Sequence, residues 1–340
     1  MKKAEEILFS IIVPVYNRPE EVADLLRSLE NQTDKGFEII IVEDGSTILS
    51  LPDDSNIPNG LRLKYFKKSN EGRSIARNYG IVRADGDYFI FVDSDCILPP
   101  EYIATVRRCI SEQPADCFGG PDAAHDSFSD TQKAINYAMT SFLTTGGIRG
   151  GKVSMEKFTP RTFNMGFSRE VYDKVEGFRE MFSEDIDMST RIRMAGFSIS
   201  LYQDAYVYHK RRGNLKKFWK QVHVFGMSRI TLQLLYPGSM KLVHWLPALF
   251  TIGAALMIIG SIFCRWMIVP LCAYLVALWI GGVCSTKSLK TGSLAVIASM
   301  VQLIGYGTGF IQDYFSKIIM GKGRDVEKEV EIRKGSNEGL

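Results

Sequence analysis

The stretch Asp87-Tyr88-Phe89-Ile90-Phe91-Val92-Asp93-Ser94-Asp95 decides the fold. Its apolar middle part is typical of a buried strand, and it ends abruptly in two carboxylates one residue apart. Because a chain can leave the extended conformation where a strand ends, the carboxylates of Asp93 and Asp95 can converge on one ion. Carboxylate oxygens suit Mg²⁺ or Mn²⁺, so we interpret both acids as metal ligands. The alternative is a polar loop whose acids are solvated or cap the next helix.

The composition excludes several classes of protein. A chain of 340 residues can bury a full core and form more than one unit. Its net charge of +3 gives no general case for nucleic-acid binding. The six cysteines have no CxxC or His-paired spacing, which favours free thiols in a reducing compartment. The short apolar run at residues 7–15 contains Pro14, and we interpret it as a first strand and not a signal peptide.

Strands and helices alternate through the first part of the chain. We expect strands at residues 9–15, 37–42, 61–66 and 88–92, and helices from residue 19, at 74–83 and at 100–113. This alternation predicts an α/β fold with a mostly parallel, doubly wound sheet. Ligands bind beyond the carboxyl ends of the strands in such sheets. Asp44 and Asp93 both follow strand ends, and this common position supports a ligand site at that edge.

A second group of acids occurs at residues 184–187, Glu-Asp-Ile-Asp, before a helical stretch. Acids in a first helical turn are also favourable to the helix dipole without any catalysis. Residues 198–208 then alternate like a strand that ends at His209, which could simply cap that strand. The glycine-rich residues 146–151 follow no strand, so they are unlike a phosphate-binding loop. They are either a mobile connector or a loop that closes over substrate.

A basic amphipathic helix is expected within residues 213–243. Six basic residues and no acid lie between residues 210 and 220, and the apolar positions recur at spacings of three and four: Leu215, Phe218, Trp219, Val222 and Phe225. This pattern suits a helix that lies in a membrane interface. The alternative is an ordinary surface helix docked on the domain.

Three apolar stretches follow, at residues 245–264, 266–283 and 294–312, and each is about long enough to cross a bilayer. We therefore expect a membrane region at residues 244–316 and a charged tail at 317–340. Gly305, Gly307 and Gly309 could form a close-packing face. If the N-terminal part is in the cytosol, three crossings would place the tail on the other side of the membrane. The basic residues of the tail, in contrast, favour the cytosolic side. Either one stretch is re-entrant or the charge rule fails.

Taken together, the motifs resemble those of family 2 glycosyltransferases, which are inverting enzymes of the GT-A fold. The matching segments occur in the usual order and spacing: SIIVPVYN at 10–17, VEDGS at 42–46, NEG at 70–72 with ARN at 76–78, DSD at 93–95 and SEDID at 183–187. The resemblance covers residues 8–212 and implies a GT-A domain at residues 1–212. The membrane-bound part is similar to the succinoglycan-type transferases, which elongate lipid-linked or membrane-exported bacterial polysaccharides.

The resemblance implies residues that bind a nucleotide sugar. Pro14 and Asp44 would flank and hydrogen-bond the base. Asn70 and Arg77 would hold the nucleotide, with Arg77 near its phosphates, and Asp93 would face the ribose or the metal.

It also implies a metal site and a sugar pocket. Asp95 would bind Mn²⁺ or Mg²⁺ directly, beside Asp93, and His209 matches a histidine that completes the metal site in some GT-A enzymes. Residues 163–166 (FNMG) would shape the pocket for sugar and acceptor.

The acids at residues 184–187 suit the chemistry of inversion. An acceptor hydroxyl must attack the anomeric carbon from the face opposite the diphosphate, and a carboxylate must take its proton. The metal neutralises the leaving diphosphate. We predict Asp185 as the base, with Glu184 and Asp187 as alternatives.

The predicted protein transfers a single sugar, because residues 218–222 (FWKQV) lack the Arg-Trp that completes the Gln-x-x-Arg-Trp element of processive synthases. The donor would be a nucleoside diphosphate sugar, with UDP favoured, and the acceptor a lipid-linked glycan on polyprenyl diphosphate. We expect a multi-pass protein of the bacterial inner membrane, in contact with membrane lipids, with a cytosolic catalytic domain and no nucleic-acid partner. The alternatives are a processive synthase and a non-catalytic membrane scaffold. A dehydrogenase is disfavoured, since no G-x-G-x-x-G follows the first strand.

Overall fold

The structure is a computed structural model that describes residues 4–51, 60–123, 129–146, 158–209, 213–324, 326 and 330–333. The chain divides into an α/β unit (Met1–Ala123, Phe158–His209 and Val330–Leu340) and a helical unit (Ala124–Lys157 and Lys210–Glu329). The α/β unit is therefore not the single run to residue 212 that we predicted. It does not include Ala124–Lys157, but it does include Val330–Leu340, which follow the apolar helices.

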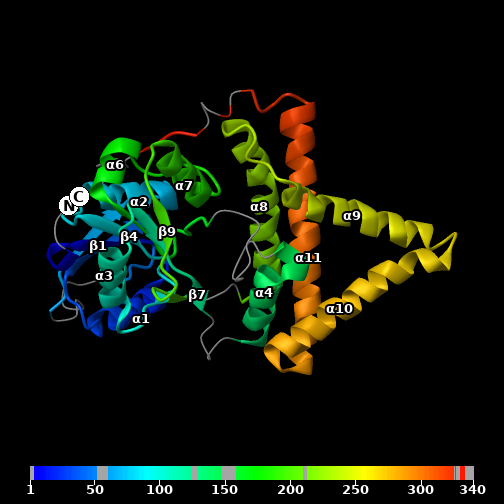
Figure 1. Ribbon diagram of the computed structural model, residues 1–340, viewed down its shortest axis with the longest axis horizontal. Coiled ribbons are helices and arrows are strands. Elements are labelled where there is room, and N and C mark those ends of the chain that lie inside the picture. Colours follow the sequence, from blue (N-terminus) through cyan, green and yellow to red (C-terminus); the bar gives the residue numbers. More distant parts are fainter. Residues whose placement is uncertain are drawn as a thin grey trace. The chain divides into compact units, whose positions relative to one another are not determined.

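Within the described residues, seven strands form the main sheet of the α/β unit, in the order β3-β2-β1-β4-β8-β6-β9 (Figure 1). The strands are β1 (Phe9–Val15), β2 (Phe37–Asp44), β3 (Leu63–Lys68), β4 (Tyr88–Phe91), β6 (Cys117–Gly119), β8 (Met165–Ser168) and β9 (Ile199–Leu201). The four strands β3, β2, β1 and β4 are parallel to one another, whereas β8 is antiparallel to both β4 and β6. The prediction of a mostly parallel α/β sheet is confirmed.

Helices cover both faces of this sheet. They are η1 (Ala4–Glu6), α1 (Pro19–Glu30), α2 (Arg73–Val82), α3 (Tyr102–Glu112), α6 (Arg169–Val175) and α7 (Glu184–Met194). Successive side chains of a strand point to opposite faces. Accordingly Ile39 and Ile41 pack in a core with α1 and α3, while Ile40 and Val42 pack in a second core with α2, α6 and α7. This is the doubly wound arrangement that the continuous apolar run of β2 predicts.

A small second sheet contains β5 (Cys96–Ile97), β10 (Val207–His209) and β7 (Asp122–Ala123). The single strand expected at residues 198–208 is wrong, because the chain turns at Tyr202, whose carbonyl accepts from Ala205 N at 3.1 Å. Its first part is β9 of the main sheet and its last part is β10. β10 pairs antiparallel with β5, and this register sets His209 opposite Cys96.

The helical unit contains α4 (Asp130–Thr140), α5 (Phe142–Thr145), α8 (Leu215–Leu235), α9 (Leu242–Gly260), η3 (Arg265–Ile268), α10 (Val269–Thr286), α11 (Leu289–Asp313) and the π-helical turn η4 (Tyr314–Ile319). Among the described residues, three segments are long and apolar enough to cross a membrane: Leu242–Gly260, Arg265–Thr286 and Leu289–Ile319. They correspond to the three predicted apolar stretches.

The glycines of α11 allow close helix packing, as predicted. A Cβ at Gly305 would lie 2.6 Å from Val222 Cγ2 of α8, and one at Gly307 would lie 2.5 Å from the carbonyl oxygen of Pro247 in α9. Gly309 lies against the backbone of His223. Larger residues at these positions would push α8 and α9 away from α11.

The apolar face of α8 is occupied by protein. Phe218 and Val222 are fully buried and pack in one cluster with residues of α4 and α11, and Leu215 and Phe225 border the same cluster. This face therefore packs on other helices of the helical unit, and not on the α/β domain as in the docked-helix alternative, and the membrane interface stays a prediction. The basic residues 210–212 and most of the glycine-rich loop at 146–151 lie outside the described residues.

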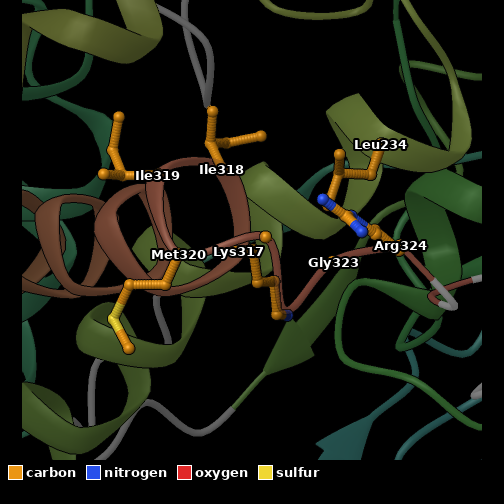
Figure 2. Close-up of a pocket in the computed structure, with 8 residues that line it drawn as sticks. Leu234, Lys317, Ile318, Ile319, Met320, Gly323 and Arg324 are labelled. Carbon is orange, nitrogen blue, oxygen red and sulfur yellow. The ribbon is translucent and has the colours of Figure 1, made fainter.

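The far end of α8 lies beside η4 and the residues that follow it. Lys317 Nζ donates to Thr231 Oγ1 at 2.6 Å and pairs with Asp313 at 2.8 Å. A Cβ at Gly323 would lie 2.6 Å from Leu234 Cδ1. Figure 2 shows Leu234 beside Arg324 at a pocket that is also lined by Lys317 and Met320. α8 is therefore in contact, up to its end, with α11 and the chain that continues from it.

Candidate active site

The short β5–β10 pairing brings Asp95 and His209 together. Asp95 Oδ1 lies 3.2 Å from His209 Nε2, and Asp95 Oδ2 lies 2.5 Å from Arg18 Nη1. Donor atoms of Asp95, Cys96 and His209 all lie within 4.8 Å of one another. The ring of His209 stacks on Phe163, with ring centroids 4.5 Å apart. Two of the three predicted metal ligands therefore meet, although they are far apart in the sequence.

The charge state of this group suits a hard metal ion. Burial alone would raise the pKa of Asp95, but the hydrogen bond and charge of His209 and the charge of Arg18 outweigh it and hold the pKa well below its usual range. Burial raises the pKa of the Cys96 thiol well above its usual value, so that thiol stays neutral. Among the described residues, His209 Nδ1 is buried without a hydrogen-bond partner. A carboxylate and an imidazole are therefore available as ligands, beside a thiol that is neutral without an ion.

Asp93 is tied to a different group. Arg77 Nη2 donates to Asp93 Oδ1 at 2.7 Å, and Arg77 Nη1 donates to Glu184 Oε1 at 3.1 Å. The Arg77 side chain is 1 % exposed, and its Nη1 and Nη2 atoms each contact one of these carboxylates. The predicted place of Arg77 near the phosphates stays a prediction, and its guanidinium is buried between the two carboxylates. Its effect is to join the strand-end acids to the acids of α7.

Arg73 supplies a second cation to the same acids. It lies one turn before Arg77 on α2, and its Nη2 donates to Glu184 Oε2 at 2.8 Å. Burial alone would lower the pKa of Arg73, but the charges of Glu184, Asp93 and Asp185 raise it. Glu184 therefore pairs with one guanidinium that, unlike Arg77, is half exposed.

The three candidate bases differ in burial. Asp187 is fully buried and pairs with Arg179 at 3.3 Å and Arg191 at 2.9 Å, so it supports the fold of α7. Glu184 is also buried, between Arg73 and Arg77. Asp185 is more exposed and contacts Arg161 Nη1 at 3.0 Å. Of the three, Asp185 has the carboxylate that a substrate could reach most readily.

The predicted base-binding residue Asp44 is held by the chain itself. Lys68 Nζ and Glu71 N donate to its Oδ1 at 2.8 and 3.0 Å, and Gly72 N donates to its Oδ2 at 2.8 Å. Asn70 Nδ2 donates to the Asp44 carbonyl at 2.9 Å and so fixes the turn after β3. Pro14 is a half-buried residue near the carboxyl end of β1, the strand beside β2.

Only part of the predicted sugar pocket reaches this site. Phe163 stacks on His209, as described above. Asn164, in contrast, is fully buried, where its Oδ1 accepts from Tyr102 OH at 2.6 Å and its Nδ2 donates to Ala205 O at 2.8 Å. Met165 and Gly166 belong to β8. Asn164 therefore stabilises the fold and does not line a pocket.

Sequence reasoning missed the arginines that neutralise the acids. Arg73 could have been found, because it lies four residues before Arg77 on one face of a helix. Arg18 and Arg161 lie in connecting segments with no periodic signal, and only the fold brings them to Asp95 and Asp185.

Residues 10–176 match the family model described as Glycosyl transferase family 2. This match contains the strand-end acids Asp44, Asp93 and Asp95 and their partners on α2, and the α/β unit has the GT-A fold. Residues 10–176, about half of the chain, are thus similar to the glycosyltransferase domain of family 2.

Two curated relatives illustrate the extent of the similarity. An uncharacterized glycosyltransferase of Rickettsia conorii is 45 % identical over 103 residues, which is 30 % of this chain and 17 % of that protein. Glycosyltransferase GlyG of Streptococcus pneumoniae is 25 % identical over 221 residues, which is 62 % of this chain and 73 % of that protein. The first three curated relatives are matched over only 12–17 % of their own length.

A solved structure shares the fold. It is the mannosyltransferase PcManGT from Pyrobaculum calidifontis in complex with GDP-Man and Mn²⁺, with a TM-score of 0.57 at 15 % identity. The match covers 92 % of this chain and 88 % of that one.

Proposed function

We propose that the chain is an inverting, metal-dependent glycosyltransferase that moves one sugar from a nucleoside diphosphate sugar to a lipid-linked acceptor. The observation that carries the proposal is the connected charge cluster at the carboxyl ends of the strands. In it Arg77 joins Asp93 to Glu184, the neighbour of Asp185, and Asp95 meets His209 two residues beyond Asp93. This is the edge at which α/β sheets bind ligands.

Asp95 and His209 would hold the metal ion, and Asp93 would stay on Arg77 or face the donor. A nitrogen ligand beside a carboxylate favours Mn²⁺ over Mg²⁺, which prefers oxygen. When bound, the ion would neutralise charge on the diphosphate. The solved mannosyltransferase with the same fold is in complex with Mn²⁺ and a nucleoside diphosphate sugar, which supports both assignments.

Asp185 would accept the proton of the acceptor hydroxyl. As the acceptor oxygen bonds to the anomeric carbon, the bond from that carbon to the diphosphate breaks, and its electron pair leaves with the diphosphate. Attack from the opposite face inverts the configuration. Arg161 would orient the carboxylate through its 3.0 Å contact, and Arg73 would offset negative charge on the open side of Glu184.

The base of the nucleotide would lie at the end of β2. Asp44 Oδ2 accepts one bond, from Gly72 N, and a carboxylate oxygen can accept another. This is compatible with the N–H of uracil, so UDP sugars are the first donors to test. Asn70 and Pro14 would border the same position.

The acceptor would be a glycan on polyprenyl diphosphate at the bacterial inner membrane, with the catalytic domain in the cytosol. The support is the three long apolar helices, which would keep the chain at the membrane where such lipids occur. The test is transfer of labelled sugar from a panel of nucleoside diphosphate sugars into a bacterial lipid extract. Release of nucleoside diphosphate without labelled lipid would contradict the acceptor, and no reaction with any donor would contradict the enzyme.

Replacing Asp95 with alanine is expected to weaken Mn²⁺-dependent donor binding at least about 100-fold. Mutating even a residue that only hydrogen-bonds to a metal ligand lowers metal affinity about 10–100-fold. Calorimetric titration of the donor in the presence and absence of Mn²⁺ measures this. The matched control is Asp204→Ala, an exposed acid paired with Arg108, which should bind like wild type. Undiminished Mn²⁺-dependent binding in Asp95→Ala would remove Asp95 from the metal site.

A further inference from the structure

The chain returns to the α/β unit after its apolar helices. Glu180 N donates to Glu331 O at 2.9 Å, and Arg179 forms a β-bridge with Ile332. Asn78 Nδ2 donates to Arg333 O at 2.7 Å. Residues 330–333 are thus held by hydrogen bonds to the unit that also contains the N-terminal strands.

The segment between the last apolar helix and this return cannot cross a bilayer. Residues 320–329 read Met-Gly-Lys-Gly-Arg-Asp-Val-Glu-Lys-Glu, so six of the ten are charged. Charged side chains at the bilayer centre are costly, and a crossing helix needs about 20 mostly apolar residues. Both ends of the apolar region therefore lie on one side of the membrane, and the number of crossings is even.

The exposed apolar surface identifies the helices that cross. In the most apolar windows of Leu242–Gly260 and Arg265–Thr286, only 22 % and 17 % of residues are buried, against 44 % in Leu289–Ile319. Large exposed apolar side chains are frequent on α9 and α10, including Leu246, Leu249, Leu256, Ile259, Val276 and Ile280. Among the described residues, Leu289–Ile319 exposes six in 31 residues, against seven in the 19 residues of α9: Leu289, Ile297, Ile311, Phe315, Ile318 and Ile319.

The neighbours of α11 also argue against a crossing. α4 packs on its N-terminal half, where Asp130 pairs with Lys290 at 2.9 Å. α8 runs parallel to its C-terminal half, where Val222 lies beside Gly305 and His223 beside Gly309, and Leu234 at the end of α8 lies beside Gly323, beyond η4. A crossing α11 would carry α8 into the hydrocarbon with it, although α8 is not among the segments apolar enough to cross.

The tip between α9 and α10 suits the opposite membrane surface. Figure 1 shows α9 and α10, in yellow and orange, leaving α11 and meeting at this tip. Cys264 and Trp266 are exposed there, and the Arg265 guanidinium lies 5.8 Å from the ring centroid of Trp266. Arg and Trp are favourable at a membrane interface, whereas an Arg in mid-bilayer is not. α9, with 19 residues, spans about 28 Å at 1.5 Å per residue, close to the hydrocarbon thickness.

We infer that α9 and α10 form a hairpin that crosses the bilayer twice in contact with lipid hydrocarbon, while α11 stays with α4 and α8 on the side of the α/β unit. The inference rests on the membrane association in the proposed function, but not on its chemistry. It resolves the conflict between three predicted crossings and the preference of the basic tail for the cytosol. With two crossings, the tail is on the side of the catalytic domain.

Cysteine labelling of spheroplasts with a membrane-impermeant maleimide tests the topology. Glu112→Cys in α3 and Glu331→Cys in the tail are matched reporters, since both glutamate side chains are 61 % exposed. Each is made in a background in which the four cysteines that are not buried (Cys109, Cys264, Cys272 and Cys284) are replaced by serine. We expect both to be labelled only after permeabilisation, whereas native Cys264 is labelled in intact spheroplasts and its label is lost in Cys264→Ser.

The labelling has two outcomes that overturn the inference. If Glu331→Cys is labelled from the side opposite Glu112→Cys, α11 crosses the membrane. If Cys264 is labelled only together with Glu112→Cys, the hairpin does not reach the far surface. Both outcomes compare a labelled position with Glu112→Cys, so they hold for either orientation of the protein in the membrane. They do not depend on transferase activity.

Membrane retention tests which helices contact lipid. Ile252 of α9 and Ile297 of α11 are matched, with exposed fractions of 49 % and 50 %. We expect Ile252→Lys to lose most of the fraction that resists carbonate extraction and Ile297→Lys to keep it. Equal loss in both would overturn the assignment of α11. A wild-type chain extracted by carbonate would refute membrane insertion itself, whether or not the transferase reaction is found.

Discussion

Asp185→Asn is expected to lower kcat by about 10²–10⁴-fold, the usual contribution of a general base. The amide keeps the shape of the side chain but cannot accept the proton of the acceptor hydroxyl at neutral pH. Donor binding should stay near wild type, because Asp185 contacts Arg161 and is not assigned to the metal or nucleotide. Initial rates with donor and lipid acceptor, together with donor titration, separate the two effects.

The other two acids provide the controls. Asp187→Asn removes a fully buried carboxylate that pairs with Arg179 and Arg191, so it should reduce stability before it affects the chemical step. Glu184→Gln should behave similarly, since Glu184 is buried between Arg73 and Arg77. A well-folded Asp185→Asn protein with wild-type turnover would exclude Asp185 as the base and leave Glu184 to be tested next.

Arg77→Met is expected to destabilise the α/β unit by about 3–5 kcal/mol, the cost of removing one partner of a buried ion pair. Methionine has a comparable length but no charge, so Glu184 would remain buried with only the half-exposed Arg73, and Asp93 would lose its partner. Denaturant unfolding of the purified chain in detergent measures the change. Metal-dependent donor binding should weaken as well, because Asp93 would no longer be fixed beside Asp95.

A surface arginine gives the comparison for this prediction. Arg27 pairs with Asp24 at 3.1 Å on the exposed face of α1, and exposed pairs contribute less than about 1 kcal/mol. Arg27→Met should therefore unfold close to wild type. If Arg77→Met were as stable as Arg27→Met, Arg77 would not be the link that holds the two acidic segments together.

The α/β core could be predicted from the sequence because its pattern is local. The apolar run of β2 places Ile39 and Ile41 on one face and Ile40 and Val42 on the other, so burial on both sides follows from the residues alone. The helix at Pro19 likewise begins where its proline indicates. The strand at residues 198–208 was wrong because its alternation continues across a turn at Tyr202, and alternation carries no information on which sheet a strand joins.

The candidate site could be predicted only in part. Asp93 and Asp95 could be predicted as candidates because they follow closely after a strand. The partners of these acids depend on long-range pairing: Arg77 reaches Asp93 and Glu184 through the packing of α2, and His209 reaches Asp95 through the register of β5 and β10. For the same reason the buried position of Arg77 could not be inferred from its motif.

The most direct test of the central claim is a thermal-shift screen of the purified full chain with nucleoside diphosphate sugars, with and without Mn²⁺. A ligand that binds only the folded state raises Tm, and saturation at about 100 times Kd corresponds to about 2.7 kcal/mol. We predict that at least one nucleoside diphosphate sugar raises Tm with Mn²⁺ present, and that the shift is lost without the ion and in Asp95→Ala. A Tm that no donor changes, or a shift that is the same without the ion, would contradict the account.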